Sequence, residues 1–178
     1  MKNRSTPNTV TQDEIDSAGR KFQIATMKGK NKNRKLKNPL PTKSDRSKLD
    51  LSNPEVVQIA DDADDMLLKI RGAITTNGKP SELTRFSSIE LVLDPTSGKS
   101  NEESLNYGSW DPSGGKLKVT VFVGTMLPLD SSQRAMQTKL TVGHELIGHS
   151  LDEGSYRDPT LSLERRADAM ARYLYDNL

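Results

Sequence analysis

Residues 141–150 read TVGHELIGHS and contain the only two histidines of the 178-residue chain. His144 and His149 are five residues apart, and Glu145 directly follows the first of them. Neighbouring apolar residues predict a helix with one buried side. In a regular α-helix, residues five apart point about 140° away from each other, because each residue advances about 100°. The two imidazoles can therefore reach one common partner only if the helix contains a wider turn, such as a π-bulge.

The residue types in this segment indicate a metal site. The chain contains no cysteine, so any metal must be bound by His, Asp or Glu side chains. Two histidines on one helix with an adjacent glutamate are a typical donor set for Zn²⁺, in which the glutamate acts as a general base. We therefore expect His144 and His149 as zinc ligands and Glu145 as the catalytic base. Gly148 is expected to lower the steric cost of the wider turn.

The segment HELIGH closely resembles the HELLGH motif of the dipeptidyl peptidase III family, which are zinc exopeptidases with the same five-residue spacing. That family takes its third ligand from a downstream motif of the form Glu-x-Arg-Ala-Glu, and residues 164–168 read ERRAD. The Glu-x-x-Ala-Asp pattern also resembles the third-ligand helix of other gluzincins. The resemblance implies Glu164 as the third zinc ligand and Asp168 as the acceptor of a hydrogen bond from a ligating histidine. Both imidazoles must then face Glu164.

This resemblance covers only residues 141–174, and dipeptidyl peptidase III is several times longer. In length and layout the chain is more similar to small effector or toxin metallopeptidases of bacteria. These combine a basic tail, a short α/β core and a Trp-x-Pro turn before a strand, as at Trp110 and Pro112. The similarity implies a zincin metalloprotease, a hydrolase that acts on a protein or peptide substrate.

The third ligand has alternatives. Asp158 lies in GSYRD, which resembles the Gly-Thr-x-x-Asp motif of aspzincins, although its short separation from His149 argues against it. Asp152 is a weaker alternative. Glu164 could instead form an ordinary ion pair with a neighbouring basic side chain.

Catalysis would need two further elements. The strand predicted over residues 116–124 could serve as an edge strand to which an extended peptide adds by backbone hydrogen bonds. Attack on a carbonyl also requires a donor that stabilises the developing negative charge. The candidates are Tyr156 and Tyr173, followed by Tyr175 and Arg157.

Charge divides the chain into two parts. Residues 1–50 carry 13 Lys/Arg and 5 Asp/Glu, whereas residues 51–178 carry 13 Lys/Arg and 19 Asp/Glu. Residues 1–52 are also poor in apolar side chains, so we expect a disordered basic tail. The basic stretch 28–48 contains no aromatic residue, and we therefore do not expect nucleic acid as a partner.

From Asn53 onward the pattern becomes that of a folded domain. Asn53 or Ser52 can cap a helix that begins at Pro54. Further elements are expected as strands over 86–94 and 116–124 and helices over 131–150 and 161–178, with a sharp turn over 106–115. These predict an α+β fold for residues 53–178: a zincin-like domain with a small mixed sheet, an active-site helix and a C-terminal helix.

The N-terminus lacks the apolar segment of a secretory signal, and no later run is apolar enough to span a membrane. We expect a monomer that is made in the cytoplasm, with export possible only by a route without a cleaved signal. A function of a different class also fits the sequence. The chain could be a catalytically inactive zincin-like binding module whose basic tail docks a protein or nucleic-acid partner.

Overall fold

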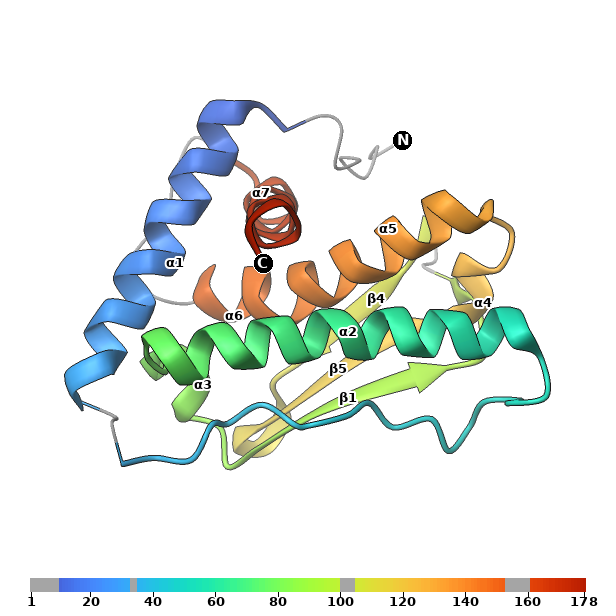
Figure 1. The fold of residues 1–178 in the computed structure, drawn as a ribbon, viewed down its shortest axis with the longest axis horizontal. Coiled ribbons are helices and arrows are strands. Elements are labelled where there is room, and N and C mark those ends of the chain that lie inside the picture. Colours follow the sequence, from blue (N-terminus) through green and yellow to red (C-terminus); the bar gives the residue numbers. More distant parts are fainter. Residues whose placement is uncertain (1–9, 33–34, 100–104, 153–160) are drawn as a thin grey trace.

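The computed structural model describes residues 10–32, 35–99, 105–152 and 161–178 (Figure 1). Its helices and strands form an α+β fold with a small mixed sheet, which confirms the predicted fold class. In chain order the elements are α1 (Gln12–Lys32), α2 (Pro54–Asn77), α3 (Ser81–Thr84), β1 (Ser88–Asp94), β2 (Gly98–Lys99), β3 (Leu105–Asn106), β4 (Gly108–Asp111), η2 (Ser113–Gly115), β5 (Lys116–Phe122), α4 (Val123–Met126), α5 (Ser131–Gly143), η3 (His144–Gly148), α6 (His149–Asp152) and α7 (Leu163–Asn177).

The main sheet has three strands in the order β1-β5-β4, with β1 parallel and β4 antiparallel to β5. Strand β5 therefore lies in the centre, and the prediction that residues 116–124 form an edge strand is wrong. The outer strand next to it is β4, which lies within the region predicted to be a sharp turn. The turn itself is confined to the residues after Pro112, where Gly114 and Gly115 have φ of 66° and 73°. Because β4 has only four residues, its sequence alone gives little indication of a strand. Its pairing with β5 defines it as one.

Helix α2 packs beside α5 over the sheet, and α5 continues through η3 into α6 (Figure 1). Asn53 caps α2 as predicted, because its side chain accepts a hydrogen bond from the backbone N–H of Glu55 at 3.0 Å. The apolar positions of α2 that face the core recur at helical spacing, and Ile59 and Ile70 among them are fully buried. The core thus lies between this helical layer and the sheet.

The prediction of a disordered tail is corrected for the part of residues 1–52 that the structure describes. Residues 12–32 form α1, which packs against α7. Its buried side chains Ile15, Ala18, Phe22 and Ala25 recur every three or four residues among polar ones. The average composition of residues 1–52 does not reveal this narrow apolar stripe. The stripe is sufficient to hold α1 in place when α7 covers it. Downstream, Asp45 forms a bridge with Val92 on the outer side of β1.

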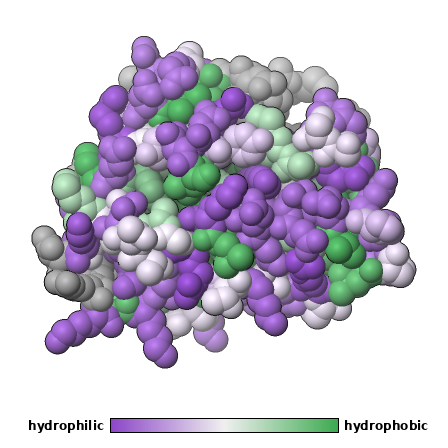
Figure 2. Space-filling model, viewed as in Figure 1, coloured by the Kyte–Doolittle hydropathy of each residue, from purple (hydrophilic) through white to green (hydrophobic). Residues whose placement is uncertain are grey.

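The face shown in Figure 2 is mostly hydrophilic, and its hydrophobic areas are small and separate. Among the described helices, none combines the length and the apolar character needed to cross a bilayer.

Candidate metal site

The helix that carries both histidines contains the wider turn that their spacing requires. Asp130 caps α5 by accepting a hydrogen bond from the backbone N–H of Gln133 at 2.9 Å. The helix then widens into η3, a π-helical turn over His144–Gly148, and continues as α6. The backbone N–H of His149 donates to the carbonyl oxygen of His144, five residues earlier. This i to i+5 bond absorbs the extra residue that would otherwise separate the two imidazoles.

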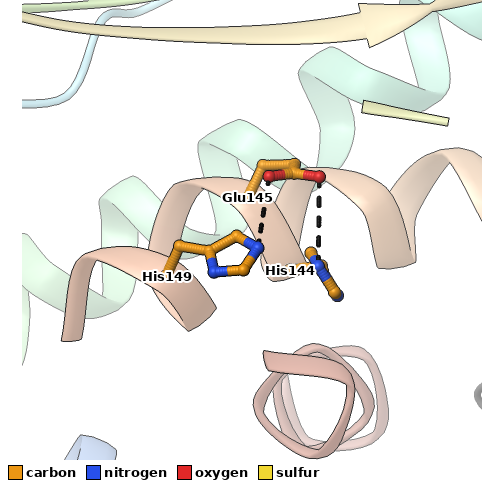
Figure 3. A group of neighbouring side chains, drawn as sticks. All are labelled: His144, Glu145 and His149. Atoms are coloured by element: carbon orange, nitrogen blue, oxygen red, sulfur yellow. Dashed lines mark ion pairs between the residues drawn. The ribbon is translucent and has the colours of Figure 1, made fainter. Parts of the chain in front are cut away.

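As a result, the two imidazoles lie against each other. Their ring centroids are 4.7 Å apart with an interplanar angle of 81°. Glu145 extends alongside both rings (Figure 3), with its carboxylate oxygens 3.9 Å from His144 Nε2 and 3.6 Å from His149 Nε2. All three side chains are buried, and one donor atom from each lies within 4.8 Å of the other two. Such a group can hold a metal ion.

A second carboxylate reaches the same two nitrogens from α7. Glu164 lies in the first turn of α7, two residues after the capping residue Ser162. Its Oε2 is 3.0 Å from His144 Nε2 and its Oε1 is 3.3 Å from His149 Nε2. The two histidines hold the pKa of Glu164 well below its usual range. The structure thus brings Glu164, distant in the chain, to the point where both imidazoles converge.

Asp168, one turn after Glu164 on α7, fixes the orientation of the first histidine. Its Oδ1 is 2.7 Å from His144 Nδ1, so the Nδ1–H donates to this carboxylate and Nε2 is directed toward Glu164. Burial lowers the pKa of His144, but Asp168 and Glu164 outweigh it and raise the pKa to about 10. The surroundings of this imidazole therefore favour positive charge, which is the requirement for a cation site.

Two observations suit these residues to a metal ion such as zinc. His144 Nε2 is buried, and although Glu164 Oε2 lies 3.0 Å away, no hydrogen bond of normal geometry satisfies this nitrogen among the described residues. The separations of 3.0 and 3.3 Å between Glu164 and the two Nε2 atoms are also close to the ligand spacing of zinc. Tetrahedral bonds of 2.0–2.1 Å place neighbouring ligand atoms about 3.3 Å apart. Glu145 is set back farther than Glu164 from both nitrogens.

Gly148 permits the close approach of α7 to η3. A Cβ atom at Gly148 would lie 2.8 Å from Cα and 2.9 Å from Cβ of Ala167, well inside normal contact. Gly143 faces Ala171 in the same way, but a Cβ there would lie 3.3 Å from the nearest atom. The sequence had suggested that Gly148 eases the wider turn. The structure shows that it also makes room for the helix that carries Glu164.

Strand β4 covers the other side of the histidine helix, a contact that the sequence did not reveal. A Cβ atom at Gly108 would lie 2.9 Å from Cγ of Glu145, so the strand backbone passes close to this carboxylate. Two residues on, the Trp110 indole N–H donates to Ser150 Oγ at 3.0 Å. The centroid of the Trp110 ring system is 6.1 Å from that of His149. Only the pairing of β4 with β5 creates this arrangement, and no sequence motif records it.

The other predicted residues lie elsewhere or outside the described residues. Asp152 is engaged by Lys21 and Arg166, so it does not supply a free carboxylate to the histidines. Tyr173 packs against α1, where its hydroxyl accepts a hydrogen bond from Gln23 Nε2 at 3.3 Å. Three predicted candidates lie outside the described residues: Asp158, Tyr156 and Arg157.

No protein-family model, curated protein or solved structure matches this chain.

Proposed function

We propose that the chain is a zinc-dependent peptidase in which His144, His149 and Glu164 hold the metal. The observation that carries this proposal is that one carboxylate, Glu164, lies against the Nε2 atoms of both histidines. A regular helix would separate the two imidazoles by about 140°. The π-helical turn and the close approach of α7 together bring both imidazoles and Glu164 to one point, which is what binding of a shared metal ion requires.

The surrounding residues suit the roles of general base and of histidine-orienting acceptor that a hydrolytic zinc site needs besides its ligands. When bound, zinc supplies a Lewis acid that makes a water molecule nucleophilic near neutral pH. Glu145, set back from both Nε2 atoms, is placed to take a proton from water and to pass it to the leaving amine. Asp168 keeps the Nδ1 proton of His144, which leaves Nε2 available as a ligand.

The substrate proposed here is an extended peptide that adds to β4. This strand is the outer strand of the described three-stranded sheet, and Gly108 brings its backbone against Glu145. A peptide paired with β4 would thus hold its carbonyl groups near the base and the two histidines.

The test combines metal analysis with a peptide-cleavage screen. Protein purified without chelator is expected to contain one zinc per chain and to cleave peptides from a proteome-derived library. Glu145→Gln should retain the zinc and lose cleavage, because it keeps the size of the side chain but removes the base. Absence of bound zinc, or full activity of Glu145→Gln, would refute the proposal. Zinc binding without cleavage by the wild-type protein would favour a zincin-like binding module instead.

A further inference from the structure

We propose that Lys21 of the N-terminal helix α1 is a positioning residue for the metal site. It acts through a buried ion cluster that it forms with Asp152 and Arg166. This inference rests on the proposed zinc site. In it, α1 supports metal binding although α1 carries none of the proposed metal ligands.

The cluster centres on a carboxylate that is almost completely buried. The side chain of Asp152 is 1% exposed. It accepts hydrogen bonds from Arg166 Nε at 2.6 Å, from Arg166 Nη2 at 2.8 Å and from Lys21 Nζ at 3.1 Å. A buried carboxylate is tolerated only when cationic donors satisfy its oxygens, so the geometry of this cluster is tightly constrained.

The cluster connects the two helices that carry the metal donors. Asp152 ends α6, three residues after His149, and Arg166 lies in α7, two residues after Glu164. Arg166 Nη1 also donates to the carbonyl oxygen of Leu161. One guanidinium therefore holds both the residue that ends α6 and a residue just before α7. The spacing between His149 and Glu164 is fixed by this bridge.

Lys21 extends the bridge to α1, which contacts α7 at two further places. Glu14 forms two hydrogen bonds of 2.8 Å with Arg165, the residue after Glu164. Farther along α1, Gly19 lies so close to the Tyr173 ring that a Cβ atom there would clash with it. Together these contacts hold α1 along α7. Loss of Lys21 would leave Oδ1 of Asp152 without one of its cationic partners and would loosen the bridge.

The experiment compares Lys21→Met with the control Arg20→Met, which removes the same charge from the exposed neighbouring residue. The dissociation constant for Zn²⁺ is measured at 25 °C by competition with a chromophoric chelator, using full-length protein. Thermal unfolding of each zinc-free variant, followed by circular dichroism, establishes that the protein is folded at that temperature. Lys21→Arg, which keeps the charge, serves as the rescue variant.

We expect Lys21→Met to weaken zinc binding by about 5- to 10-fold, at the low end of the effect of residues that orient metal ligands. Arg20→Met should bind like the wild type, and Lys21→Arg should recover most of the affinity. A lower melting temperature with unchanged zinc affinity in the folded protein would overturn the inference, because it would show a merely structural role.

If Lys21→Met does not fold, Glu14→Gln takes its place, since it loosens α1 near Arg165 without unpairing a buried charge. It should also weaken zinc binding, and an unchanged affinity would overturn the inference. A wild-type protein that binds no zinc would refute the metal site itself, and this inference with it. Wild-type binding with equal binding by the variants would refute only the role of α1.

Discussion

The close approach at Gly148 makes the most specific prediction. Substitution by alanine places a Cβ atom 2.8 Å from Cα of Ala167, about 0.6 Å inside the 3.4 Å at which ordinary contact begins. Because the nearest atoms belong to the backbone and Cβ of Ala167, rotation of a flexible side chain cannot relieve the clash. Helix α7 must therefore move away from η3, and Glu164 moves with it.

The magnitude follows from overpacking in a dense core. An added methyl group that forces backbone shifts costs about 1–3 kcal/mol, partly offset by up to about 1 kcal/mol because alanine favours helix over glycine. We expect Gly148→Ala to lower the free energy of unfolding of the zinc-free protein by about 1–2 kcal/mol. A displacement of about 0.6 Å exceeds the roughly 0.5 Å within which a preorganised site must be held, so zinc affinity should fall by about tenfold or more.

Gly143→Ala is the matched control, since it adds the same methyl group to the same helix against the same partner. Its Cβ atom would meet Ala171 at 3.3 Å, a contact that a small adjustment can relieve. Urea unfolding and chelator competition for Zn²⁺ measure the two effects separately. The reasoning is refuted if Gly148→Ala is as stable and binds zinc as tightly as Gly143→Ala.

Three further predictions concern single side chains around the site. Asp168→Asn should weaken zinc binding by about 10- to 100-fold in chelator competition, because the Nδ1–H of His144 loses its charged acceptor. Asp152→Asn should lower the free energy of unfolding at pH 7 by about 3–5 kcal/mol in urea, because it leaves two cations around a buried site without their carboxylate. Burial raises the pKa of Asp152, but its two cationic partners outweigh this and lower it. The contribution of this carboxylate is therefore complete above its unfolded pKa of about 3.9 and is lost as the pH falls through the lower folded value, a dependence that Asp152→Asn should lack. Zinc should change the emission of Trp110, the only tryptophan, because its ring centroid lies 6.1 Å from that of His149, and an unchanged spectrum on stoichiometric binding would contradict this placement.

The features that the sequence predicted are those governed by local rules. The spacing of His144 and His149 required a wider turn because the angle per residue in a helix is fixed, and the structure contains a π-helical turn at that place. The cap at Asn53 was similarly readable, since a side chain that accepts from the backbone two residues on is a local interaction. Glu164 was found by resemblance of a second motif and not by any local rule.

The features that the sequence missed depend on contacts between distant segments. Helix α1 has a narrow apolar stripe that is stable only because α7 covers it, so the composition of this region suggested disorder. Strand β4 contains four residues and exists through its pairing with β5. The contact of Trp110 with Ser150 and the close fit of Gly148 against Ala167 follow from these arrangements. No pattern along the chain reports such distances.

The most direct test of the central claim is zinc-edge X-ray absorption spectroscopy of the zinc-loaded protein. The account predicts one zinc per chain with two imidazole nitrogens and at least one carboxylate oxygen at about 2.0–2.2 Å. His149→Ala should lose one imidazole or fail to retain zinc. A spectrum of the wild-type protein with fewer than two imidazoles around the metal, or a protein that takes up no zinc, would contradict it.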